Sequence, residues 1–166
     1  MTDIESVLDT VEHIQKVRRW LTIAIANLQS RLMDHDASKL RSPELEGFLR
    51  ITARLRDIKY GSDEYRAALR EEKPTIEHHQ KANDHHPEFF KNGIAGMDCF
   101  QLIEMLCDWK AAGERTKDGS MVRSLEINRE RFGMGTAIFH AIVLTAHSLA
   151  MITHFEAEKL LGEKFP

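Results

Sequence analysis

The chain has 166 residues, with 23 basic and 26 acidic side chains and 42% hydrophobic residues. This composition is typical of a folded globular protein and excludes the disordered and collagen-like classes, and at this length we expect one domain over residues 1–166. The formal net charge of -3 and the scattered Lys and Arg residues create no basic field, so nucleic acid is disfavoured as the main partner.

The first residues favour a cytoplasmic protein, and neither a membrane span nor a disulfide is expected. The first residues carry the acids Asp3 and Glu5 where a secretory signal would carry basic residues. The most apolar stretch, 137–152, contains polar side chains and is shorter than the roughly 20 residues of a membrane span. If Cys99 and Cys107 share a helix they lie about 12 Å apart, beyond disulfide reach, so both are expected as free thiols.

The spacing of apolar residues predicts an all-α fold. Several stretches place these residues three and four positions apart, and none shows sustained alternation with period two. Helices are expected from Ile4 to Met33, from Pro43 onward, from Ser62 onward, from Asp98 to Gly113, from Ser120 to Arg131 and from Gly135 to Leu161. We therefore expect a compact helical bundle.

Capping residues and prolines set several of the helix boundaries. Ser42 is expected to cap a helix whose first turn contains Pro43, and the segment 59–62 then breaks that helix. Ser62 opens the next helix, in which Pro74 either introduces a kink or starts a separate segment.

A polar segment from Asn83 to Gly96 contains proline and glycine and shows no clear periodicity, so we expect a loop there. Asp98 follows it and forms a capping-box pattern with Gln101, which begins the next helix. Loops held between helices in this way often carry functional residues.

Histidine is unusually clustered in this chain. Four of the nine histidines fall in two pairs, His78-His79 and His85-His86. Neutral imidazole is the commonest metal ligand in proteins, and carboxylates complete mixed nitrogen and oxygen sites. The cluster therefore indicates a metal site, with a solvated polar loop as the alternative.

Other acidic and imidazole groups are weaker signals when taken singly. His35-Asp36 is a dipeptide whose side chains would point about 100° apart on a helix, so further ligands must come from other elements. Glu104 and Asp108 are like charges one helical turn apart, which repel unless a cation lies near; a solvated helix edge is the alternative. His13 on the first helix is more typical of a partly buried side chain than of a ligand.

Taken together, the order His13, His35-Asp36, a histidine group and Asp108 resembles the H…HD…D signature of the HD-domain superfamily of metal-dependent phosphohydrolases. The motif HDASK and the segments KYGSDEY, HHQKANDHHPEFF, GIAGMDCFQLIEMLCDWKAA and SLEIN are similar to a small, largely uncharacterised HD-like family of bacteria and bacteriophages. The resemblance implies an HD-domain-like helical bundle around a divalent metal, while the reaction must be argued from the site itself.

Carried onto this sequence, the resemblance implies that a first metal is held by His13, His35, Asp36 and Asp108. One histidine of each pair would serve a second ion. We take His79 and His86 as these ligands and assign His78, His85 and Asn83 to substrate contacts, although the choice within each pair stays open. Asn83 and Glu88 are further candidates for groups that support the ligands.

Lys39 marks a departure from the small HD 5'-deoxynucleotidases, which resemble HDxSE and have a glutamate at this position. A charged lysine cannot act as that base, but its compact positive charge suits a phosphate contact. We therefore assign Asp36 and Lys39 as the catalytic pair, Asp36 to hold the metal and orient the nucleophile and Lys39 to bind phosphate. A surface salt bridge is the alternative for Lys39.

Three further histidines, His140, His147 and His154, fall seven positions apart and would share one face of a continuous helix. Neighbours would lie roughly 10 Å apart along that helix, too far to share one ion. Core or oligomer packing is therefore expected there, and this apolar helix makes a homodimer reasonable.

The sequence thus predicts a phosphohydrolase that uses one or two divalent ions, Mn, Fe, Co, Ni or Zn with Mg as a further option, on a nucleotide or small phosphate ester. Two other classes stay open. One is an HD-fold diiron oxygenase, and the other is a non-catalytic protein that binds a nucleotide or effector. No membrane partner is expected.

Overall fold

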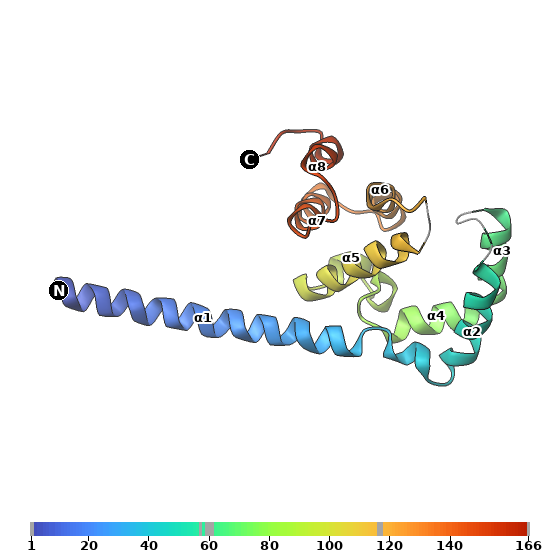
Figure 1. Cartoon of the computed structure of the whole chain (residues 1–166), viewed down its shortest axis with the longest axis horizontal. Coiled ribbons are helices and arrows are strands. Elements are labelled where there is room, and N and C mark those ends of the chain that lie inside the picture. The colour runs from blue at the N-terminus through green and yellow to red at the C-terminus, as the bar shows by residue number, and fades with distance from the viewer. Residues whose placement is uncertain (1, 57, 59–61, 116–117, 166) are drawn as a thin grey trace. The chain divides into compact units, whose positions relative to one another are not determined.

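The computed structural model describes residues 2–56, 58, 62–115 and 118–165, and over these residues the chain is all-α and has no strand (Figure 1). The elements are α1 (Asp3–Asp34), η1 (Ala37–Leu40), α2 (Glu44–Leu55), α3 (Asp63–Glu71), α4 (Lys73–Ala82), η2 (Pro87–Phe89), η3 (Gly93–Gly96), α5 (Cys99–Glu114), α6 (Met121–Arg131), α7 (Thr136–Ser148) and α8 (His154–Leu161), where η marks a short 3-10 helix. The predicted all-α class is confirmed. None of the helices described is long and apolar enough to cross a membrane.

The chain divides into two units, Met1–His35 and Asp36–Pro166. The first unit is α1, which begins with a capping box: the Thr2 hydroxyl accepts a hydrogen bond from the backbone of Glu5, and the Glu5 carboxylate accepts one from Thr2. This single helix confirms the one predicted from Ile4 to Met33. The assignment of residues 1–166 to one domain stays a prediction.

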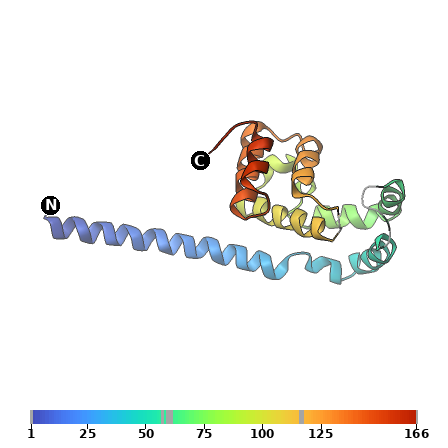
Figure 2. The same cartoon turned by 45° about the horizontal axis from the view of Figure 1, so that its top comes forward.

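The core of the second unit lies among α5, α6, α7 and α8, which pack together in Figure 2 as the yellow, orange and red ribbons. The buried apolar side chains of this core are Ile94, Met105, Leu106, Met121, Leu125, Met134, Phe139, Ile142, Val143, Ala146, Ile152 and Ala157. Trp109 of α5 stacks on Phe132 with the ring planes 4° apart. This packing fixes α5, whose acidic residues face the site described below.

The continuous helix predicted from Gly135 to Leu161 is wrong, because the chain breaks between α7 and α8. Ala150 takes a left-handed conformation with φ of 54°, which ends the first helix. Thr153 then opens α8 with a capping box, in which Glu156 accepts a hydrogen bond from the Thr153 backbone at 2.7 Å. The rings of His147 and His154 still lie 5.4 Å apart across the break.

The predicted boundaries of the middle helices are partly correct. The residue at the N-cap of α2 is Pro43, which provides no side-chain hydrogen bond, so the expected cap at Ser42 is wrong. Ser62 does cap α3, accepting a hydrogen bond from the Tyr65 backbone at 3.1 Å. Pro74 lies in the first turn of a separate helix, α4, as one of the two alternatives proposed. The helix break predicted at 59–62 falls, except for Ser62, outside the described residues.

Gly47 allows α2 and α4 to approach closely. A Cβ atom at this position would overlap the Thr75 side chain, so any larger residue would push the two helices apart. One turn earlier on α2, this approach brings Glu44 beside the histidines of α4. Glycine at position 47 is therefore needed to place Glu44 beside these histidines.

The cap of α5 carries a first stability prediction. The Asp98 carboxylate accepts hydrogen bonds from the backbones of Phe100 and Gln101 at 2.8 and 2.9 Å, which confirms the predicted capping box. Asp98→Ala should lower the free energy of unfolding by about 1 kcal/mol in urea titrations followed by circular dichroism. Asp98→Asn, which keeps an acceptor, should lose much less, and equal losses in both variants would contradict this role.

Candidate metal centre

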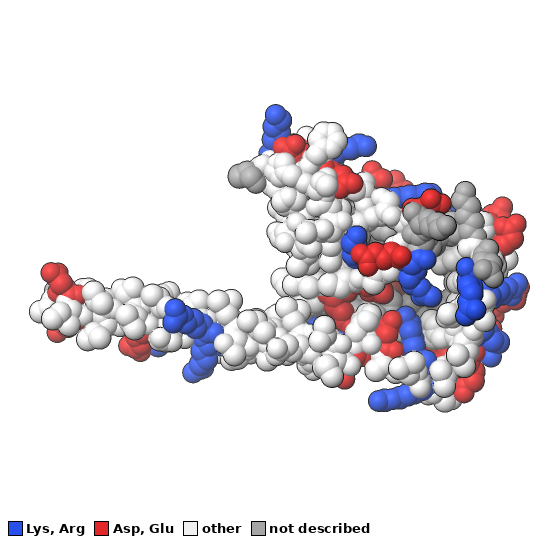
Figure 3. All heavy atoms as spheres, viewed as in Figure 1, with Lys and Arg blue, Asp and Glu red and all other residues white. Residues whose placement is uncertain are grey.

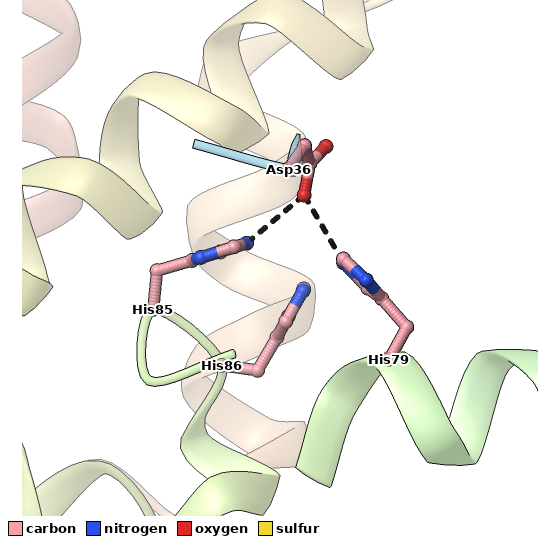
Figure 4. Close-up of side chains that lie close together, drawn as sticks. All are labelled: Asp36, His79, His85 and His86. Carbon is pink, nitrogen blue, oxygen red and sulfur yellow. Dashed lines mark ion pairs between the residues drawn. The ribbon is translucent and has the colours of Figure 1, made fainter. Parts of the chain in front are cut away.

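Asp36 stands at the centre of a group of convergent side chains. It follows His35 directly and takes a left-handed backbone conformation with φ of 57°, which aspartate tolerates better than most residues. Its Oδ1 atom lies 3.1 Å from Nε2 of His79 and 3.4 Å from Nε2 of His85, the two contacts dashed in Figure 4. The backbone turn at this residue therefore aims the carboxylate at the histidines.

Three histidines point toward this carboxylate from two elements (Figure 4). His79 comes from α4, while His85 and His86 come from the loop that follows it, and His79 and His85 are each 3% exposed. One ligand atom from each histidine and one from Asp36 all lie within 4.8 Å of one another. Within the described part of the chain, the buried Nε2 atoms of His79 and His86 have no hydrogen-bond partner.

Two of these histidines have a second carboxylate on the opposite side of the ring. Nδ1 of His79 lies 2.8 Å from Oε2 of Glu44, and Nδ1 of His85 lies 3.3 Å from Oε1 of Glu104. Such a carboxylate fixes a proton on Nδ1 and leaves the lone pair on Nε2, which is the usual support behind a metal-bound histidine. Both rings therefore present the correct nitrogen to the space beside Asp36.

Glu44 is the carboxylate that contacts and orients His79. It is 1% exposed, and its two oxygens contact His78 at 2.8 Å, His79 at 2.8 Å and the hydroxyl of Ser38 at 2.8 Å. Burial alone would raise the pKa of Glu44, but these hydrogen bonds hold it below its usual value. A buried and ionised glutamate thus orients one ring of the convergent group.

The electrostatics keep the inward-facing atoms in forms that can bind a cation. Burial opposes ionisation of Asp36, but the imidazoles of His79 and His85 and the ammonium of Lys39 hold its pKa well below the usual range. Burial and the neighbouring histidines lower the pKa of His86 to about 3. At neutral pH the group therefore combines a carboxylate with a neutral imidazole.

This arrangement passes a direct test of fit for a divalent ion. Two ligands held about 2.1 Å from one ion at angles of about 95–110° would lie about 3.1–3.4 Å apart, which matches the distances from Asp36 to His79 and His85. With its proton on Nδ1, His79 turns a lone pair toward a carboxylate oxygen. Those two electron-rich atoms repel each other unless a proton or a metal ion lies between them.

Helix α5 adds two further acids to the same region. Glu104 contacts His85, and a carboxylate oxygen of Asp108 lies within 4.8 Å of one of Asp36. The two residues are four positions apart and share a helix face. Of the like-charge pair that the sequence singled out, Glu104 therefore faces His85 and Asp108 faces Asp36, and a cation there would offset their repulsion.

Lys39 lies at the edge of the group and is already engaged. Its Nζ atom lies 2.5 Å from Oδ2 of Asp36 and 4.9 Å from the centre of the Phe48 ring. The Phe48 ring in turn packs edge-on against His79. The lysine charge thus balances the outer oxygen of Asp36, while the inner oxygen faces the histidines.

The remaining residues that the sequence assigned to the site make different contacts in the structure. His78 turns to the outer oxygen of Glu44 with a half-exposed side chain, and Asn83 donates hydrogen bonds to Ser38 and to the backbone of His79. Glu88 forms an ion pair with Arg131 at 2.7 Å. His85 lies among the convergent ligands, although the sequence assigned it to substrate.

His13 and His35 belong to the first unit, His13 as an exposed residue of α1 and His35 at its C-terminal end. Their roles as ligands stay predictions. The expectation that His140, His147 and His154 form no shared metal site also stays a prediction. In the structure, His140 contacts Glu163 at 3.7 Å and His154 contacts Glu158 at 3.5 Å.

Residues 2–155, which include every residue of the convergent group, match the model of one protein family. Searches of curated proteins and of solved structures gave no match. The matched range covers most of the chain, which therefore belongs to DUF5662, a family of unknown function.

Proposed function

We propose that this protein is a metal-dependent phosphohydrolase that acts on a nucleotide or another small phosphate ester. The observation that carries the proposal is the convergence of Asp36, His79, His85 and His86, with the buried carboxylate of Glu44 and the partly buried one of Glu104 behind two of the three rings. The order of these residues along the chain also resembles the HD-domain pattern. A phosphate ester suits such a site because its reaction needs an activated water and a positive field.

The donor set favours a transition metal. Imidazole nitrogen with carboxylate oxygen suits Mn, Fe, Co, Ni or Zn, whereas Mg prefers oxygen ligands and stays a weaker option. Glu104 and Asp108 give the site further oxygens, so a second ion remains part of the proposal. When bound, the metal would supply Lewis-acid chemistry that activates water and neutralises phosphoryl charge.

The protein's own residues would hold the ligand geometry, orient the imidazole rings and contact the phosphate. Asp36 holds the ligand geometry and offers one carboxylate oxygen to the site, while Glu44 and Glu104 orient the rings of His79 and His85. Lys39 and the half-exposed His78 lie at the edge, where they can contact a phosphate. Asn83 instead supports His79 through hydrogen bonds to Ser38 and to the His79 backbone.

The cytoplasmic location suggested by the sequence belongs to this proposal. Cys99 and Cys107 of α5 are free thiols, as the sequence predicted, and both are exposed. Free thiols suit a reducing compartment. Small phosphorylated metabolites, the proposed substrates, are abundant there.

The proposal is tested by measuring bound metal and phosphate release on the same preparation. Mass spectrometry should find about one or two transition-metal ions per chain. Chelation should abolish phosphate release from a panel of nucleotides and small phosphate esters, and one of Mn, Co, Ni, Fe or Zn should restore it. Oxygen consumption by an iron-loaded protein without phosphate release would replace this function with the oxygenase, and stable nucleotide binding without turnover would replace it with the binding protein.

A further inference from the structure

Helix α1 carries a continuous apolar stripe that no part of its own unit covers. Apolar residues recur at alternating spacings of three and four at positions Ile4, Val7, Val11, Ile14, Leu21, Ile25, Leu28 and Leu32, with Arg18 at the one interruption. Except for the partly buried Leu28, these apolar residues are 41–77% exposed. The pattern is the a and d repeat of a coiled coil, sustained over more than four heptads.

The charges on α1 are separated along its length. Asp3, Glu5, Asp9 and Glu12 precede Lys16, Arg18, Arg19 and Arg31, and Asp34 is the last residue of the helix. Figure 3 shows red acidic side chains at the N-terminal end and blue basic ones farther along a largely white helix. An antiparallel copy therefore brings Asp3 in the first turn of one chain near Arg31 in the last turn of the other, whereas a parallel copy would place the two acidic first turns together.

Arg18 strengthens the argument about direction. In a parallel pair the two Arg18 side chains would meet in one core layer, which adds a like-charge contact. In an antiparallel pair each Arg18 lies opposite an apolar residue and can extend its charged end to solvent along its aliphatic stem. We propose that two copies of this chain dimerise through an antiparallel pairing of their α1 helices.

The repeat specifies one register for this pairing. Ile4 of one copy shares a layer with Leu28 of the other, Val7 with Ile25, Val11 with Leu21, and Ile14 with Arg18. In the same register Asp3 of one copy flanks Arg31 of the other, so opposite charges meet beside the apolar layers. His13, the one residue of α1 before His35 that the sequence assigned to a metal, lies off the stripe. The dimer contacts therefore do not depend on the proposed metal chemistry.

Light scattering on the full chain tests the dimer. At micromolar concentration the mass should be twice the 19.1 kDa of one chain. Ile25→Asp should shift the protein to the monomer mass, because it places a charge in the seam, with an unchanged core of the second unit checked by thermal unfolding. Ile23→Asp is the matched control, since Ile23 is also exposed but lies off the stripe, and it should remain a dimer.

Cross-linking tests the direction. In a Cys99→Ser, Cys107→Ser background, chains with Ile4→Cys and chains with Leu28→Cys should form mixed disulfides when combined and few homodimeric ones when separate. Homodimeric disulfides in both would show a parallel pair and overturn the proposed direction. A monomeric wild-type chain, or equal dissociation by Ile23→Asp and Ile25→Asp, would overturn the interface itself.

Discussion

Replacing Asp36 by alanine is expected to abolish metal-dependent turnover. Its Oδ1 atom is the common point of contact for His79 and His85, so the variant loses the carboxylate ligand and the charge that offsets a bound cation. Phosphate release should fall at least about a thousandfold, which corresponds to about 4 kcal/mol of transition-state stabilisation. The measurement is phosphate release by the purified variant beside the amount of metal that it retains.

A second variant guards against simple loss of the fold. Alanine fits the left-handed conformation of Asp36 less well than asparagine does, so Asp36→Asn tests the charge while preserving the backbone turn. Added metal should raise the melting temperature of the wild type but not that of Asp36→Asn. Asp63→Ala, which removes an exposed carboxylate of α3, serves as the control and should behave as wild type. Full turnover by both Asp36 variants would refute the proposed site.

The predictable part of the fold follows from local chemistry. The apolar spacing in α1 and the capping box at Asp98 act over a few residues, and the structure confirms both. The break between α7 and α8 depends on Ala150 in a left-handed conformation, which alanine does not signal in a sequence. The capping-box pattern of Thr153 with Glu156 could have indicated that a new helix begins there. The surrounding apolar residues instead favoured one continuous helix.

In the site, too, the residue types could be predicted from the sequence, whereas the contacts that depend on helix packing could not. Clustered histidines and the His35-Asp36 pair mark the region, because metal ligands have a distinct residue chemistry. Glu44 was missed because a glutamate near a helix start is typical of an exposed residue that interacts with the helix dipole. Only the approach of α2 to α4 at Gly47 buries it beside His79. The contact of Glu104 with His85 likewise depends on how α5 packs.

Glu44→Gln is expected to weaken metal binding by about 10–100-fold without changing the number of ligands. The amide has the shape of the carboxylate, so it preserves packing between α2 and α4. However, it removes the negative charge that holds the proton on Nδ1 of His79 at 2.8 Å and makes Nε2 a stronger donor. The loss should appear as a higher dissociation constant in metal titrations by calorimetry.

Glu46→Gln provides the matched control, because Glu46 lies on the same helix two residues later and is exposed. It should bind metal as tightly as the wild type. If Glu44→Gln lowered the melting temperature of the metal-free protein but left the affinity for metal unchanged, Glu44 would only stabilise the fold. A loss of affinity confined to Glu44→Gln would instead show that this buried carboxylate acts through His79 on the ion.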